Sequence, residues 1–320
     1  MRDMPEVQFA EVNGIRLAFF EAGPKDAAAP PLVLCHGWPE LAYSWRRQIR
    51  ALSEAGYRVI APDMRGFGLS PGPEAVEAYD LQTITGDLAG LLDHLGVEKA
   101  IFVGHDWGGA AVWRMAQEHP ERVAGVIGLN TPHPARAPVN PIEVFRKRLG
   151  DDFYMVEFQR PERDADRIFA ENIDKFFAFF FRGPPLSGGG SGKPNLAFQK
   201  IVPQYDPAKD TRPAFLSPEE MAVFVETYRK TGFTGGIDWY RNIERNWRRA
   251  AELPERIDAP CLMIMAEGDV VLPPSAADGM ENRIADLEKT LIRDCGHWTM
   301  QEQPEATNAA MLDWVKRKFG

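Results

Sequence analysis

The sequence places one carboxylate, that of Asp106, at a tight turn that is sterically unfavourable for a residue with a side chain. Asp106 lies between Gly104 and Gly108 in the stretch VGHDWGG, after the apolar run KAIFVGH and before the helical pattern GAAVWRMAQEHP. A strand, a G-x-nucleophile-x-G turn and a helix together expose the central side chain, and glycines flank it because neighbouring Cβ atoms would collide. The pattern predicts that Asp106 is a nucleophile.

The identity of the central residue decides the chemistry. Serine at this position serves esterases and lipases, whereas a carboxylate attacks a saturated carbon that bears a leaving group and forms an alkyl ester. The same attack on an ester or amide would give a labile anhydride. The backbone N–H of Trp107 and the dipole of the following helix favour an anion at this turn. We therefore expect a covalent alkyl-enzyme intermediate on Asp106.

Two further residues complete the order nucleophile, acid, histidine. Asp269 follows the apolar run CLMIMAEG, and His297 lies in the loop after KTLIRDC. We expect His297 to act as a general base that Asp269 orients. Asn130, after the sixth strand, is the other position from which an acid could reach the histidine, and it is not acidic.

The rhythm of the chain predicts how these residues are positioned. Strand and helix patterns alternate up to Asn130 and resume near residue 260, which indicates an α/β fold with a mostly parallel, doubly wound sheet. Residues from about 135 to 250 are helical, aromatic and Pro-rich. We expect a core domain of residues 1–134 and 250–320, with a helical cap of residues 135–249 inserted after the sixth strand. In the cap, PPLSGGGSGKPN resembles a synthetic linker, and the sequence leaves open whether the Gly/Ser-rich part near 187–192 is native or engineered.

Bulk properties exclude several classes of protein. The 320 residues carry a net charge of −9, which disfavours nucleic-acid and anionic-membrane partners. The three cysteines have neither paired nor metal-ligand spacing, so we expect no disulfide frame and no metal site. No apolar stretch of about 18 residues and no signal-peptide pattern occur, so we expect a cytoplasmic protein.

Several motifs resemble one family. HGWPE, RGFGLS and GHDWGG, together with FYMVEFQ and GFTGGIDWYRNIERNW, are similar to epoxide hydrolases of the α/β-hydrolase fold, of the soluble type but without its N-terminal phosphatase domain. The resemblance implies that epoxides become vicinal diols and that no cofactor is needed. It implies that Tyr154 and Tyr240 hold and protonate the epoxide oxygen. Backbone N–H groups of Trp38 and Trp107 would form the oxyanion hole, with a cis bond before Pro39.

The expected partners are a small lipophilic epoxide and water. The aromatic run FFAFFF in the cap suggests an apolar pocket. We expect four residues to line this pocket: Trp38, Trp107, Trp239 and His133. Monomer and homodimer both remain open.

Two other functions remain as alternatives. A haloalkane dehalogenase shares the Asp nucleophile and the histidine, but Trp38 has no side-chain amide to offer a halide, and the tyrosine pair favours an epoxide. A catalytically silent hydrolase-fold binding protein is the second alternative. We expect such a protein to have lost one of the catalytic residues, and all of them are present.

Overall fold

An eight-stranded sheet forms the centre of the computed structural model, which describes residues 3–183 and 196–320. The Gly/Ser-rich stretch near 187–192 lies outside these residues. The strand order is β1-β2-β4-β3-β5-β6-β7-β8; β1 and β2 are antiparallel to their neighbours and the other six strands run parallel. The strands are β1 Val7–Val12, β2 Ile15–Ala22, β3 Leu32–Cys35, β4 Val59–Pro62, β5 Ala100–His105, β6 Val123–Leu129, β7 Cys261–Ala266 and β8 Leu287–Ile292. The predicted mostly parallel sheet is confirmed.

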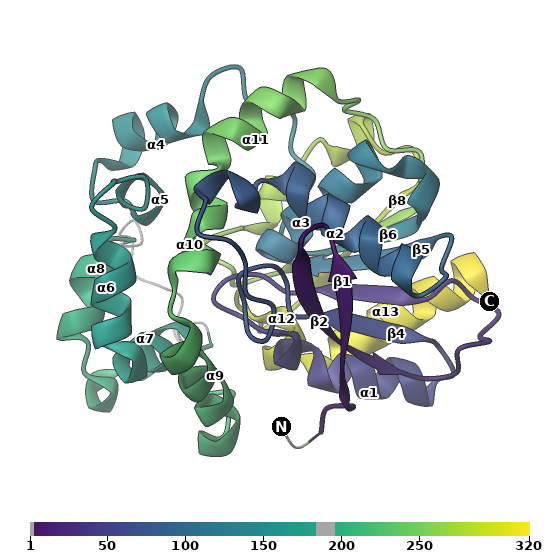
Figure 1. The fold of residues 1–320 in the computed structure, drawn as a ribbon, viewed down its shortest axis with the longest axis horizontal. Helices are drawn as coiled ribbons and strands as arrows, with labels where there is room; N and C mark the ends of the chain where they lie inside the picture. The colour runs from purple at the N-terminus through teal and green to yellow at the C-terminus, as the bar shows by residue number, and fades with distance from the viewer. Residues whose placement is uncertain (1–2, 184–195) are drawn as a thin grey trace.

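Helices cover both faces of the sheet, which explains why its central strands are apolar without interruption. In β3, Val33 and Cys35 belong to one apolar cluster, and Leu32 and Leu34 to the other. Residues of two helices pack in the first cluster and residues of two more in the second, so each pair covers one face (Figure 1). The first pair is α2 Leu81–His94 and α3 Trp107–Glu118; the second is α1 Arg46–Glu54 and α13 Pro304–Phe319.

The segment between β6 and β7 is helical, as the sequence predicts. Within its described residues no strand occurs beyond an isolated bridge between Arg182 and Ala214. Figure 1 shows most of these inserted helices gathered to one side of the sheet. They are α4 Pro141–Leu149, α5 Tyr154–Glu157, α6 Asp164–Glu171, α7 Ile173–Phe180, α8 Phe198–Ile201, α9 Pro218–Thr231, α10 Thr234–Arg241 and α11 Ile243–Arg249.

Glycines let α10 approach the core closely. A Cβ at Gly235 would lie 2.6 Å from the carbonyl oxygen of Gly66, and one at Gly236 would lie 2.5 Å from Cδ1 of Trp38. One turn later, the indole N–H of Trp239 donates to the carbonyl of Arg65 at 3.0 Å. These contacts fix the helix that carries Tyr240 against the loops at the carboxyl ends of the strands.

A single helical turn, α12 Thr299–Glu302, follows the loop that carries His297. Across residues 3–183 and 196–320, no helix combines the length and the apolar character that crossing a bilayer requires.

Candidate active site

The turn at Asp106 has the strained geometry that its sequence predicts. Asp106 follows β5 directly, precedes α3, and has φ +52° and ψ −120°. A Cβ at Gly104 would lie 2.2 Å from the carbonyl oxygen of Gly108, and a Cβ at Gly108 would lie 2.0 Å from that of Cys35. Only glycine fits at either place, so the flanking glycines allow the backbone that presents the carboxylate.

The two oxygens of the Asp106 carboxylate have different surroundings. Oδ1 accepts a hydrogen bond of 2.8 Å from the backbone N–H of Trp38, in a loop with the expected cis peptide before Pro39. Oδ2 lies 3.7 Å from Nε2 of His297. Trp107 begins α3, and first-turn N–H groups have no partner within their helix. One oxygen is therefore already bound by a backbone donor, and the other faces the histidine.

Asp269 binds the other side of the histidine. Its Oδ2 lies 2.8 Å from Nδ1 of His297, and its Oδ1 accepts from the backbone N–H groups of Val271 and Leu272 at 2.8 and 2.9 Å. Burial alone would raise the pKa of Asp269, but the His297 charge and these donors outweigh it and hold the pKa well below its usual range. Asp269 is therefore a fixed negative charge that orients the imidazole.

The same charges act on His297. Burial opposes protonation of this imidazole, yet the carboxylates of Asp269 and Asp106 more than offset that effect and hold the pKa of His297 well above its usual value. Because Asp106 contributes to this shift, any reaction that neutralises Asp106 lowers the pKa of His297.

The inserted helices bring Tyr154 and Tyr240 together. Their ring centroids are 5.6 Å apart, and the ring of Tyr240 meets that of Trp107 edge-on at 5.0 Å. Both tyrosines are buried. Burial and then the charge of Asp106 raise the pKa of each hydroxyl well above its usual value, so both remain hydrogen-bond donors.

Of the predicted pocket residues, the three tryptophans contact Tyr240 or one another, whereas His133 has other contacts. The Trp38 ring packs edge-on against Tyr240 at 5.5 Å and against Phe rings of the inserted helices, and Trp239 contacts the Trp107 ring at 6.0 Å. His133 lies elsewhere: Nε2 donates to the carbonyl of Glu255 at 2.8 Å, and its ring packs on Trp113. These contacts of His133 involve none of the catalytic candidates, and its place in the pocket stays a prediction.

The structure also shows hydrogen bonds from Asn130 and His105 to Asp269 and His297 that the sequence did not suggest. The amide of Asn130 donates to Oδ2 of Asp269 at 2.7 Å, so Asn130 is a hydrogen-bond partner of that carboxylate. His105 connects Glu40, 2.6 Å from its Nδ1, with the carbonyl of His297, to which Nε2 donates at 2.7 Å. Glu40 belongs to the buried motif HGWPE. Its charge inside that motif was the feature of the sequence that could have identified it.

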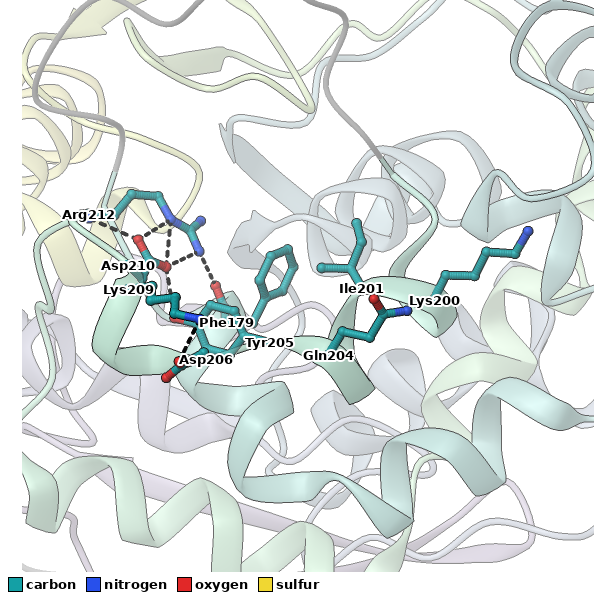
Figure 2. A pocket seen from close by; sticks show the side chains of 9 residues that line it. All are labelled: Phe179, Lys200, Ile201, Gln204, Tyr205, Asp206, Lys209, Asp210 and Arg212. Carbon is teal, nitrogen blue, oxygen red and sulfur yellow. Dashed lines mark hydrogen bonds and ion pairs between the residues drawn. The ribbon is translucent and has the colours of Figure 1, made fainter.

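A cavity of about 670 Å³ lies between α7, α8 and the segment after them, and Figure 2 shows its side chains. Its charged groups all have partners: Arg212 donates to Asp210 at 2.7 Å and lies over the ring of Phe179, the Tyr205 hydroxyl donates to Asp210 at 2.7 Å, and the two lysines pair with Asp152 and Asp206. Asp106 and His297 are not among its lining residues, and we place no site there.

Known proteins resemble the chain over nearly its full length. Residues 30–167 match the family model of the alpha/beta hydrolase fold. Epoxide hydrolase A of Mycobacterium tuberculosis is 41% identical over 97% of each chain. Bifunctional epoxide hydrolase 2 of Sus scrofa is 38% identical over 95% of this chain, which spans about half (54%) of that protein's length.

A solved structure of an epoxide hydrolase is also similar to this chain. The crystal structure of epoxide hydrolase A from Mycobacterium thermoresistibile superposes with a TM-score of 0.86, at 39% identity over 98% of both chains. At these levels of identity and coverage, and with an aspartate at the turn between β5 and α3, the chain belongs to the epoxide hydrolase family of the α/β-hydrolase fold.

Proposed function

We propose that this protein converts lipophilic epoxides to vicinal diols through an alkyl ester on Asp106. One observation carries the proposal. Two buried tyrosines, from α5 and α10, have ring centroids 5.6 Å apart, and the ring of Tyr240 lies 5.0 Å from that of Trp107, the residue next to Asp106. An epoxide oxygen stays attached to the substrate as it leaves and needs a proton, whereas a halide departs as a stable anion. A pair of hydroxyl donors therefore fits an epoxide better.

Ring opening forms the ester. Oδ2 of Asp106 attacks an epoxide carbon, the C–O bond on the far side breaks, and the oxygen takes a proton from Tyr154 or Tyr240. Attack neutralises the Asp106 charge, which is a cause of the raised pKa of both tyrosines. The tyrosines therefore become stronger acids as the alkoxide forms, which is when a proton donor is needed.

Hydrolysis then uses His297. With Asp106 esterified, one cause of the raised pKa of His297 is gone, so the neutral imidazole becomes accessible. Nε2 takes a proton from water, and the hydroxide attacks the ester carbonyl. The Oδ1 oxyanion receives the N–H of Trp38, which already binds that atom, and of Trp107. One such donor contributes roughly 3 kcal/mol. The C–O bond of the tetrahedral intermediate to the substrate then breaks, the leaving oxygen takes the proton from Nε2 of His297, and the diol leaves. The proton that remains on the Asp106 carboxyl group returns to the tyrosinate, so that Asp106 is again a carboxylate.

We infer that the inserted helices, with boundaries near 135 and 249, form a cap that supplies both tyrosines and an apolar wall. Trp38 meets Phe158, Phe176 and Phe180 at centroid distances of 5.5 to 5.7 Å. Such a surface favours aryl or alkyl epoxides over small polar ones.

A paired turnover assay tests the proposal against its alternatives. One arm follows diol from styrene oxide, and the other follows bromide from a small bromoalkane. Diol without bromide supports the epoxide assignment. Bromide without diol indicates a dehalogenase, and an inert protein in both arms favours a binding module.

A further inference from the structure

The catalytic histidine lies in a loop without regular secondary structure, between β8 and the single turn α12. The last residue of that turn, Glu302, reaches back to the loop. Its Oε2 accepts from the backbone N–H of Gly296 at 2.8 Å, and its Oε1 accepts from that of Trp298 at 2.9 Å. One carboxylate thus holds the amide on each side of His297.

The carbonyl of His297 is held as well, by the 2.7 Å hydrogen bond from Nε2 of His105. The backbone around the catalytic histidine is therefore fixed by two side chains from outside the loop. Its imidazole must serve two partners: Nδ1 stays 2.8 Å from Asp269, and Nε2 must reach a water beside the Asp106 ester. A misplacement of about 1 Å is enough to cost on the order of 100-fold in rate.

Helix capping explains only half of the Glu302 contacts. Trp298 is the N-cap residue of α12, so the bond to its N–H belongs to the ordinary satisfaction of a helix start. Gly296 lies two residues before the cap and is no part of the helix. A carboxylate accepts on both oxygens, whereas a glutamine would turn an N–H₂ donor toward one of the two amide donors.

We propose that Glu302 is a positioning residue for the catalytic base: by binding the amides of Gly296 and Trp298 it sets His297 for hydrolysis of the ester, and it takes no part in forming that ester. This role rests on the function proposed above. A defect at Glu302 should therefore slow only ester hydrolysis, because attack by Asp106 does not need the base.

The test compares Glu302→Gln with Glu302→Asp and with the control Glu305→Gln, which removes an exposed carboxylate from the first turn of α13. Purified proteins are mixed with styrene oxide, acid-quenched at intervals and weighed intact. We expect ester formation in Glu302→Gln within about twofold of the control and hydrolysis slowed about tenfold or more. The fraction of enzyme that carries the ester at steady state then rises.

Glu302→Asp keeps the charge and shortens the reach by one methylene, so we expect it to accumulate ester too. This variant also supplies the test if Glu302→Gln does not fold. Equal slowing of both steps, or no added ester in a folded variant, would overturn the role, because a purely structural defect lowers the active fraction without raising ester occupancy. His297→Gln is mixed in parallel: no ester there contradicts the proposed function itself, which a failure at Glu302 alone does not.

Discussion

The backbone N–H of Trp38 donates to Oδ1 of Asp106 at 2.8 Å, so the donor expected to stabilise the oxyanion binds the carboxylate that we propose as the nucleophile. This contact assigns different tasks to the two carboxylate oxygens. In the proposed mechanism, Oδ1 is the atom on which charge develops during ester hydrolysis, and Oδ2 is the atom that attacks. The donor needs no rearrangement between the two half-reactions.

Tyr240→Phe should slow ring opening by about 10- to 100-fold, because Tyr154 remains as a donor. Hydrolysis of the ester should change little, since that step needs His297 and the backbone donors. Quenched-flow mass measurement of ester formation and decay separates the steps. Equal slowing of both would show that Tyr240 does not act on the epoxide oxygen.

Asp106→Asn should lower the pKa of His297, because Asp106 is one of the carboxylates that raise it and the amide resembles the neutral ester. NMR titration of the imidazole in the variant and the wild type checks this. Ester decay needs neutral His297, so its rate should rise with pH. The midpoint of that rise should be the pKa of His297 in the ester, which lies below the pKa of His297 in the free enzyme. An unchanged pKa in the variant would contradict the coupling.

Gly236→Ala should loosen the contact between α10 and the core, because the new Cβ would lie 2.5 Å from Cδ1 of Trp38. We expect a loss of about 1–3 kcal/mol in the free energy of unfolding. Tyr240 lies one turn further along the same helix, so ring opening should slow more than hydrolysis. Denaturant unfolding and the two half-reaction rates measure these effects. Wild-type stability together with a wild-type ring-opening rate would disprove the packing argument.

The sheet and the strained turn at Asp106 could be predicted because each depends on local pattern. Central strands are uninterrupted apolar runs, and the constraints on Asp106 come from glycines two residues away. Tyr154 and Tyr240 could be named only through a family resemblance. The contact between their rings depends on how two helices pack whose tyrosines are 86 residues apart in the sequence. No short motif encodes that packing.

Supporting contacts were harder still to predict. The bond from Asn130 to Asp269 joins residues 139 positions apart, and Glu40 and His105 are separated by 65. For Glu302 there was a local signal, an acid four residues after the N-cap Trp298, but its second bond to Gly296 depends on the path of the loop. The cap boundaries and the cytoplasmic location stay predictions.

The covalent intermediate is the central claim, and His297→Gln tests it most directly. This variant lacks the base but keeps Asp106 and both tyrosines, so it should be alkylated and then fail to turn over. Intact-mass measurement after mixing with styrene oxide should show one substrate mass added per chain, and peptide mapping should place it on Asp106. A folded variant that gains no mass, or gains it at another residue, would contradict the mechanism.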